Sequence, residues 1–256
     1  MSGYLQGFSL LIGGVVLVCV FAKWESRISY PVLDLRLFKI RQFAAANLSQ
    51  LLNTIAWTGT LLLLVFYLQI GLGYTPLQAG VAIVPLEVAF FVAVLFGGKL
   101  SDKYESRALC TIGLIINSFS FFTIATFDIA TPYSEIVIAM IGVGVGMGLF
   151  NSANQRAILV SVPQNRRGIA SAFLETMNTS GFSTSYGLVI LFMTFGISYA
   201  ALSSLLQGTE SSATLLARMQ FIDGFRIAAF LLAVLNTIAI IPSAVRGGSA
   251  SAAVRD

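Results

Sequence analysis

The stretch GGKLSDKYESR, residues 97–107, places five charged side chains between two long apolar runs. These runs cover residues 77–98 and 108–127. Of the 256 residues in the chain, only 10% are charged and 57% are hydrophobic, whereas a soluble domain carries about 25% charged residues. Because so few charges cannot cover a soluble surface, the apolar runs are expected to face lipid.

Seven stretches are long enough to cross a bilayer core of about 30 Å, which takes roughly 20 residues of helix. Each is an apolar run without the alternation of a barrel strand, so we expect an all-α membrane protein with seven transmembrane helices. The first run lacks a preceding basic residue and a small-residue cleavage site, which favours a spanning helix over a signal peptide. The expected spans are residues 3–22, 43–69, 77–98, 108–127, 134–155, 168–196 and 222–244.

Basic residues are concentrated in alternate segments between the spans. Of the 15 Lys and Arg, 13 lie between the first and second, third and fourth, and fifth and sixth spans, or after the last. By the positive-inside rule these segments are cytoplasmic, so we expect a multi-pass protein of the plasma (cytoplasmic) membrane with its N-terminus outside and its C-terminus inside. The net charge of +4 therefore indicates contact with membrane lipids, and no motif indicates a nucleic-acid partner.

The residues that the chain lacks exclude several functions. It has no His and only two Cys, so no transition-metal site and no cofactor is expected. No nucleophile–base constellation is present, and an enzyme is not expected. A retinal protein needs a Lys in its last helix, but the lysines all lie on the cytoplasmic side, at positions 23, 39, 99 and 103.

The segment KWESRISYPVLDLRLFKIRQF, residues 23–43, interleaves apolar and basic side chains as an interfacial segment does. It resembles the linker before the C-terminal half in the fourteen-helix drug:proton antiporters of the major facilitator superfamily. The linker pattern in that family is Glu-x-Arg, then Pro, then Leu-Phe-basic-x-basic-x-Phe. The residues that match it are Glu25, Arg27, Pro31, Leu37, Phe38, Lys39, Arg41 and Phe43.

Residues 97–107 carry a second resemblance, to the Gly-x-Leu-x-Asp-basic loop between the second and third helices of a half in that superfamily. Glu105 stands where Gly is usual and Ser106 where a basic residue is usual, while Arg107 keeps one of the two basic positions. The matching residues are Gly98, Leu100, Asp102 and Lys103.

The resemblance implies a domain organisation. Residues 1–42 would be a linker transmembrane helix with a cytoplasmic interfacial segment, and residues 246–256 a cytoplasmic tail. Residues 43–245 would form the six-helix C-terminal half of a transporter, built as a 3+3 inverted repeat. An N-terminal half missing from this chain, or a second copy, would be the partner.

The function that the resemblance implies is secondary active transport by alternating access. It would be proton-coupled export of drugs or other amphipathic small molecules, with the proton gradient as energy source and no cofactor. The alternative is a non-transporting membrane subunit, or a truncated and degenerate transporter fragment, that acts only by packing with another membrane protein.

Polar residues on two spans are candidates for the wall of a transport cavity. On span 43–69 four of them recur at helical spacing and share one face. We favour the cavity role, because the first helix of a half lines the cavity in the family; the alternative is hydrogen bonding to neighbouring helices. The candidates are Asn47, Gln50, Thr54 and Trp57, with Asn151 and Asn154 on span 134–155.

Glu87 is the first candidate for proton coupling. It lies near the bilayer midplane, two residues after Pro85, where an ionised carboxylate is costly and the group would tend to be protonated. The alternative is a carboxylate held by a structural partner.

Glu175, near the cytoplasmic end of its span, is a secondary candidate for proton coupling. We favour a structural ion pair with Arg156, Arg166 or Arg167 for it. At the opposite end of the bundle, Asp223 and Arg226 are expected to pair with each other, at i and i+3.

Two further expectations concern helix contacts. Gly142 with Gly146, and Gly144 with Gly148, form two small-residue faces that permit close helix packing. In the cytoplasmic motif, Asp102 would either accept bonds at a helix N-terminus or pair with Arg156, as a latch that breaks when the transporter changes state. The plain alternative is a solvated turn. The motif residues are Gly98, Asp102, Lys103, Arg107 and Arg156.

Overall fold

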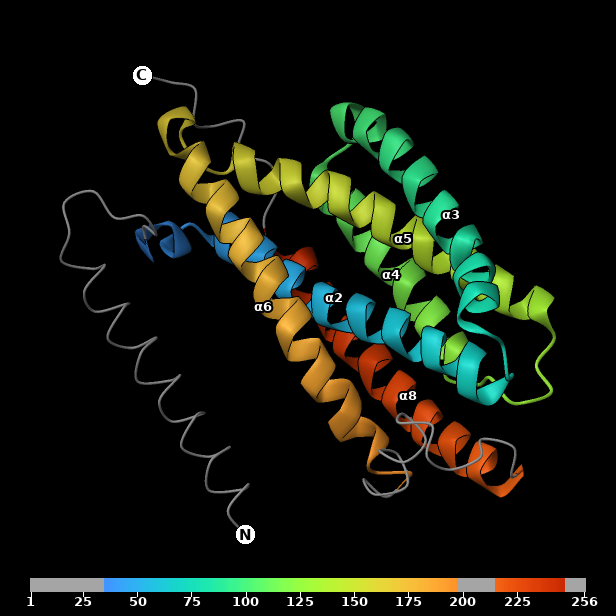
Figure 1. Cartoon of the computed structure of the whole chain (residues 1–256). Coiled ribbons are helices and arrows are strands. Elements are labelled where there is room, and N and C mark those ends of the chain that lie inside the picture. The colour runs from blue at the N-terminus through green and yellow to red at the C-terminus, as the bar shows by residue number, and fades with distance from the viewer. Residues whose placement is uncertain (1–34, 198–214, 247–256) are drawn as a thin grey trace, which may run out of the picture.

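The computed structural model describes residues 35–197 and 215–246, and these ranges form a bundle of long helices (Figure 1). Expected span 3–22 and the tail after residue 246 lie outside the described residues, so the predictions about them stay untested. The elements are η1 (Leu35–Lys39), α2 (Arg41–Phe66), η2 (Tyr67–Gly71), α3 (Pro76–Lys103), α4 (Ser106–Ile124), α5 (Tyr133–Val160), η3 (Gln164–Arg166), α6 (Arg167–Met193) and α8 (Leu215–Val245).

The other six expected spans are helices, and most of their ends agree with the sequence analysis to within a few residues. The largest difference is at α8, which begins at Leu215 instead of residue 222. An apolar run marks only the part of a helix inside the hydrocarbon, and α8 continues beyond it through a first turn and a half interrupted by Arg218 and Gln220.

The start of α3 shows how local sequence sets a helix boundary. Gly73, with φ of 74°, turns the chain after η2 in a conformation that L side chains rarely adopt. Thr75 then caps the helix in a reciprocal capping box with Gln78, and Pro76 occupies the first helical position, where no backbone N–H is needed.

Five described helices are long and apolar enough to cross a membrane: α2 with η2, α3, α4, α5 and α8. The remaining long helix, α6, has 27 residues but does not reach the same hydropathy. Its polar content lies on its exposed side, which carries Glu175, Thr176, Thr179, Ser180, Ser183 and Thr184. Within the described residues, α6 is therefore the one long helix with such a polar stretch on its outer face, although Phe182, Tyr186, Ile190 and Leu191 are exposed on it as well.

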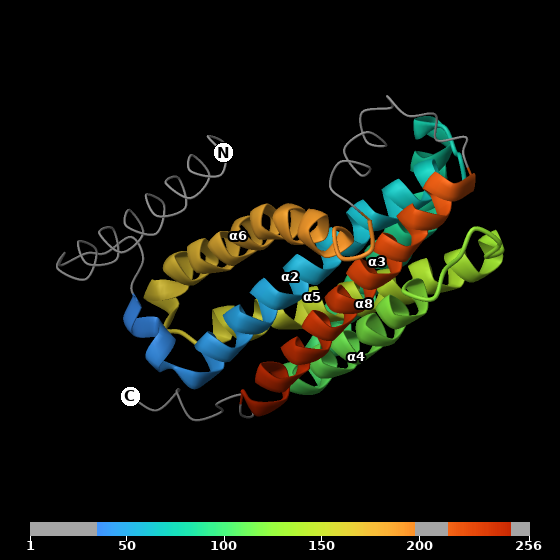
Figure 2. The same ribbon diagram turned by 90° about the horizontal axis from the view of Figure 1, so that it is seen from below.

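The helices pack in two matching sets of three. Helix α3 packs on α5 as α6 packs on α2, and α4 packs on α5 as α8 packs on α2. Helices α4 and α8 also pack on each other, which completes the pattern, and Figure 2 shows α2 crossing between α6 and α8. Exchanging α2, α3 and α4 for α5, α6 and α8 preserves these contacts. Because each set has an odd number of helices, the second crosses in the opposite sense, which is an inverted 3+3 repeat.

Side-chain hydrogen bonds tie these packed pairs together. Ser49 Oγ donates to Ala239 O at 3.2 Å between α2 and α8, and Asn236 Nδ2 donates to Ser118 Oγ at 2.9 Å between α8 and α4. Ser185 Oγ of α6 donates to a carbonyl of α2 at 2.8 Å. Polar contacts of this kind hold membrane helices together, because lipid offers the polar groups no other partner.

Both small-residue faces of α5 are confirmed. Gly142 and Gly146 face α4, and Gly144 and Gly148 face α3. A Cβ atom added at Gly148 would lie 2.6 Å from Ala93 Cβ and 2.8 Å from a backbone oxygen of α3. The absence of side chains is therefore what lets α5 lie directly against both neighbours.

We predict that Gly148→Val lowers the thermal midpoint of the purified protein, because overpacking a tight contact costs about 1–3 kcal/mol or more. Differential scanning fluorimetry in detergent measures the midpoint. Gly80→Val is the matched control, since nothing lies within 4 Å of a Cβ at Gly80 in the same bundle. Equal effects of the two substitutions would contradict the packing role of Gly148.

Candidate functional site

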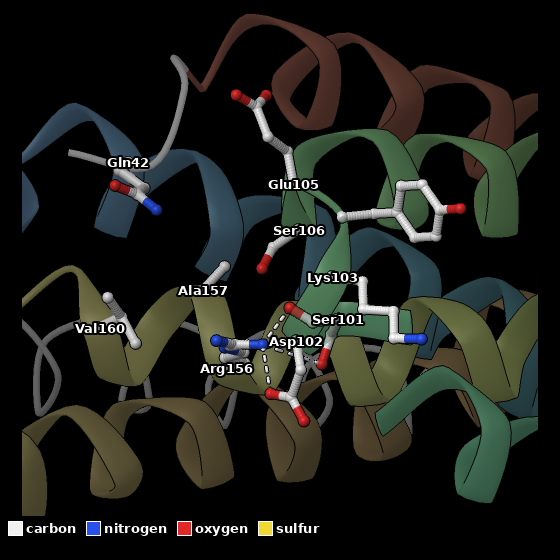
Figure 3. A pocket seen from close by; sticks show the side chains of 10 residues that line it. Gln42, Ser101, Asp102, Lys103, Glu105, Ser106, Arg156, Ala157 and Val160 are labelled. Atoms are coloured by element: carbon white, nitrogen blue, oxygen red, sulfur yellow. Dashed lines mark hydrogen bonds and ion pairs between the residues drawn. The ribbon is translucent and has the colours of Figure 1, made fainter. Parts of the chain in front are cut away.

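The charged turn between α3 and α4 is joined to α5 by an ion pair. Arg156 Nη1 lies 2.7 Å from Asp102 Oδ1, and the same guanidinium donates to the carbonyl oxygen of Ser101 (Figure 3). The side chains are 41% and 74% exposed, respectively. Exposed pairs contribute about 0–1 kcal/mol, so this contact can form and break at little cost.

The ion pair depends on a close approach of α3 to α5 one turn earlier. Gly97 is buried, and a Cβ atom there would meet the side chain of Ser152 and lie 3.4 Å from Gly148 O. Gly98 faces open space, although it is the glycine that matches the family motif. The neighbouring residue Gly97 therefore provides the steric freedom that brings Asp102 beside Arg156.

A cavity of about 280 Å³ lies beside the ion pair, between the charged turn, α5 and the start of α2 (Figure 3). Both motif positions that depart from the family pattern, Glu105 and Ser106, line it. The lining residues are Gln42, Ser101, Asp102, Lys103, Tyr104, Glu105, Ser106, Arg156, Ala157 and Val160.

The structure thus brings Asp102, Lys103 and Arg156 together, while Gly98 and Arg107 lie outside the cavity lining. The hydrogen bond of Asp102 in the described residues is to Arg156, and the start of α4, the next helix, has no side-chain cap. Of the two contacts expected for Asp102, a helix N-terminus or Arg156, the structure has the one with Arg156. Its role as a latch stays a prediction.

The polar face of α2 is buried between helices. Gln50 and Thr54 are each 1% exposed, and both bond Asn178 of α6. Gln50 Oε1 also accepts from Asn154 Nδ2 of α5 at 2.9 Å. Asn47 donates to a carbonyl of its own helix at 2.9 Å. In this structure the face makes the interhelical hydrogen bonds that were the alternative to a cavity wall, and lining of a cavity stays a prediction.

Trp57 and Asn151 are partly buried. The Trp57 ring lies 5.9 Å from that of Phe90 on α3, centroid to centroid, at the side of the bundle where α2 and α3 meet. Together they form an aromatic wall at the edge of the exposed face of α3.

Glu87 is exposed on α3, and its carboxylate makes no ion pair or hydrogen bond to any described residue. Val84 and Phe91, at i−3 and i+4 on the same helix side, are 50% and 64% exposed. The carboxylate therefore projects from an apolar surface that no described residue covers. The alternative, a carboxylate held by a structural partner, finds no such partner among the described residues, and proton coupling stays a prediction.

The expected ion pair of Glu175 is not found within the described residues, where Arg156 contacts Asp102 instead. Glu175 Oε2 accepts a hydrogen bond from Asn178 Nδ2 at 3.5 Å. The helical spacing of three residues allows this local contact, whereas Arg156 is held by the turn on the other side of α5.

The expected pair of Asp223 with Arg226 is wrong. Arg226 Nη2 lies 3.4 Å from Asp128 Oδ2, and its Nε donates to Phe127 O at 2.8 Å. The long guanidinium reaches the loop between α4 and α5, whose carbonyl and carboxylate oxygens converge on it. Spacing along one helix predicts partners on that helix only, and it cannot predict a partner such as Asp128 on a loop that packs against it.

Sequence reasoning missed two residues that structure the polar interior. Neither Asn178 of α6 nor Arg246 at the end of α8 is among the candidates that the sequence analysis names. Arg246 is in fact 2% exposed and bonds Asn154 Oδ1 at 3.0 Å. The signal that could have found it is its place directly after an apolar span, within reach of the bundle interior.

A helical bundle with an inverted repeat, in which five of the described helices are long and apolar enough to cross a membrane, is the architecture of a multi-pass membrane protein. Residues 3–186 match the Major Facilitator Superfamily. This match covers well over half of the chain, and the chain belongs to that superfamily.

Relatives support the same assignment. The uncharacterized transporter YebQ of Escherichia coli is 29% identical over 199 residues, 75% of this chain and 44% of YebQ. The multidrug efflux pump LfrA of Mycolicibacterium smegmatis is 29% identical over 163 residues, 64% of this chain and 32% of LfrA. The fatty acid resistance protein FarB of Neisseria gonorrhoeae is 31% identical over 153 residues, 59% of this chain and 30% of FarB.

The chain thus spans less than half the length of these relatives. The resemblance to drug-efflux members of the superfamily is confirmed, and the chain is a membrane-embedded member of a transporter family and not an enzyme.

We predict that Asp102→Asn loosens the contact between the charged turn and α5 without a large loss of stability, because the pair is exposed. The readout is labelling of Ala157→Cys by a hydrophilic maleimide, in a background where Cys19 and Cys110 are replaced by alanine. Ala157 is 2% exposed and lines the cavity beside Arg156, so release of the guanidinium increases its labelling.

Lys103→Gln is the control for this experiment, since Lys103 lines the same cavity and is also charged and exposed. If both substitutions raised the labelling equally, the stretch would be a solvated turn in which the ion pair has no particular role.

Proposed function

We propose that this chain forms the C-terminal half of a proton-coupled exporter of amphipathic small molecules in the plasma membrane, with its N-terminus outside and its C-terminus in the cytoplasm. The observation that carries this proposal is the exposed face of α6. Ser and Thr side chains and Glu175 occupy that face over several turns, at depths where a lipid-facing helix is apolar. Such a face requires protein or water against it.

The other surfaces of the bundle differ from that face. The outer side of α3 exposes Val81, Val88 and Leu95, and the outer side of α8 exposes Ile238 and Ile241. These side chains suit lipid or an apolar protein contact. The polarity of the bundle surface therefore favours one particular side for a second transporter half.

The lengths of the relatives agree with a half. The chain covers 30–44% of the three relatives described above, and its described helices already make one complete 3+3 repeat. Alternating access then requires a partner half against which this bundle rocks. The exposed Asp102–Arg156 pair is suited to a contact that opens in one state and closes in the other.

Glu87 is the group to which we assign proton coupling. It lies 11 residues after the start of α3, about 17 Å along a helix that is about 42 Å long, and it has no partner in the described residues. An exposed carboxylate at that depth can bind a proton from one side and release it to the other as the surrounding water path changes.

The neighbouring aromatic wall suggests the substrate class. Trp57 and Phe90 lie at the edge of the face that carries Glu87. Aromatic rings beside a carboxylate suit molecules with an apolar body and a cationic group, through burial and cation–π attraction. The names of relatives such as the multidrug efflux pump LfrA are consistent with this class.

The second candidate function is a non-transporting membrane subunit. The observation in its favour is that Gln50, Thr54 and Asn154 are already satisfied inside the bundle, which leaves fewer polar groups for a substrate. Such a subunit would use the α6 face only to pack with another membrane protein.

We predict that Glu87→Gln reduces proton-driven export to the level of passive leak, because the amide keeps the size of the side chain and cannot carry a proton. The measurement is substrate efflux driven by an imposed pH gradient in proteoliposomes that hold this chain assembled with the N-terminal half. Glu135→Gln is the control, since Glu135 is an exposed carboxylate in the first turn of α5, away from the midplane. Unchanged export by the Glu87 variant would exclude it as the coupling group.

We also predict that a photoreactive benzophenone side chain at Ser180 cross-links to protein in the native membrane, because the α6 face is covered by a partner half. The same group at Ile241, which is 63% exposed on α8, is the control and is expected to label lipid. Gel mobility separates the two kinds of adduct. Lipid adducts alone at Ser180 would contradict the half-transporter proposal.

A further inference from the structure

Arg246, at the C-terminal end of α8, is a buried cation with neutral partners. Its Nε donates to Ser243 O at 3.0 Å, its Nη2 to Ser243 Oγ at 2.7 Å and its Nη1 to Asn154 Oδ1 at 3.0 Å. No carboxylate pairs with it in the part of the chain that the structure describes. A buried charge without a counter-charge is costly, so the hydrogen bonds that lead away from Arg246 indicate how its charge is stabilised.

The orientation of the Asn154 amide is fixed by two unambiguous neighbours. A guanidinium can only donate and a backbone carbonyl can only accept, and Asn154 bonds one of each, Arg246 and Ala46 O. Its oxygen must therefore face Arg246, and its nitrogen must face Ala46 O and Gln50 Oε1, at 3.1 Å and 2.9 Å.

The amides of Gln50 and Asn178 are oriented by their neighbours in the same way. Because Gln50 gives its oxygen to Asn154, its nitrogen is left to donate, and it bonds Asn178 Oδ1 at 2.9 Å. Asn178 then has only its nitrogen for the next contact, and that nitrogen donates to Glu175 Oε2 at 3.5 Å. Each amide accepts on the side of Arg246 and donates on the side of Glu175.

We propose that Arg246 and Glu175 are the two charged ends of one polarised hydrogen-bond chain that runs through Asn154, Gln50 and Asn178 and so joins α8, α5, α2 and α6. All four links donate in the same direction, from the cation to the carboxylate. Bonds aligned in this way polarise and strengthen one another.

Arg246 and Glu175 act in this chain as positioning residues. They set which atom each amide presents and hold α6 against α2, although the two charged groups are joined to each other only through the chain. This inference does not rest on transport, since it concerns hydrogen bonds within the bundle, which run from the buried Arg246 to Glu175 on the exposed side of α6. Its failure would leave the proposed function standing.

The test first replaces a hydrogen-bond donor at position 50 by an acceptor. It then compensates for this change by a second substitution at position 175. In Gln50→Glu, measured at a pH where the new carboxyl group is ionised, one carboxylate oxygen still accepts from Asn154 Nδ2, but the other faces Asn178 Oδ1. Asn178 must then turn its nitrogen toward the new carboxylate at position 50 and its oxygen toward Glu175, which places two acceptors against each other. Adding Glu175→Gln supplies an amide nitrogen that can donate to the turned Asn178.

We expect Gln50→Glu alone to lower the thermal midpoint by about 4 °C or more, since about 1 kcal/mol shifts the midpoint by about 2–4 °C in a chain of this size. Glu175→Gln alone changes it little, because its oxygen still accepts from Asn178. The double variant recovers most of the loss. Residues 50 and 175 share no direct hydrogen bond, so a double variant no better than Gln50→Glu would overturn the proposal.

Relief of direct repulsion between the carboxylates at positions 50 and 175 could also raise the thermal midpoint of the double variant. A variant that interrupts the hydrogen-bond chain at position 178 separates the two explanations. The same cycle is measured in an Asn178→Ala background, where position 178 is partly buried and Ala suits a helix. Loss of the recovery there supports the chain, and persistence of the recovery overturns it. Should that background be too unstable to purify, the cycle is repeated at 1 M salt, where exposed charges are screened within about 3 Å. Recovery that survives the salt supports the chain, and recovery that disappears overturns it.

The Arg246 end is tested by its own cycle. Arg246→Met and Asn154→Ala are measured singly and together, and a chain that starts at this contact gives a combined loss clearly smaller than the sum of the two single losses. Additive losses would overturn the assignment of Arg246 as the starting cation.

Discussion

The close approach of α5 to α3 and α4 is the constraint on which the rest of this bundle depends. Four glycines on alternate sides of α5 leave room for the backbones of both neighbours. In lipid no hydrophobic driving force brings the helices together, so dispersion contacts and hydrogen bonds at such distances hold the bundle together. The same close packing fixes the position of the C-terminal part of α5, where Asn154 faces α2 and Arg156 faces the charged turn.

The two polar regions at the end of α5 are therefore consequences of packing. Asn154 and Arg156 lie two residues apart, so they point to different sides of the helix and serve different neighbours. One side carries the buried hydrogen bonds of Asn154, and the other an exposed ion pair. A single helix thus links a rigid contact and a contact that opens easily.

Helix boundaries, the class of the fold and the glycine faces could be predicted from sequence, because each follows from composition or from helical period. The contact of Asp102 with Arg156 was one of two predicted alternatives. This contact could be predicted because a charged turn and a charged helix end at the same membrane surface have few other partners.

The partners of the remaining charged groups could not be predicted, for a physical reason. Arg226 binds oxygens of the loop between α4 and α5, and Glu175 binds an amide on its own helix. Periodicity shows which face a side chain occupies, but it does not show which helix lies against that face. Gln50 and Thr54 illustrate this, since a polar face has the same sequence pattern whether it meets water or Asn178.

The polarity of α6 has a consequence for how the protein enters the membrane. A segment inserts by itself when its partition free energy from water into lipid is favourable, and α6 falls short of the hydropathy that the other five long described helices reach. Its insertion therefore depends on helices already in the bilayer, chiefly α2, against which it packs. Because α2 precedes α6 in the chain, α2 is made first and can receive α6 as it is synthesised. The polar side chains on the exposed side of α6 thus make its insertion an assisted step of biogenesis, which follows the insertion of α2.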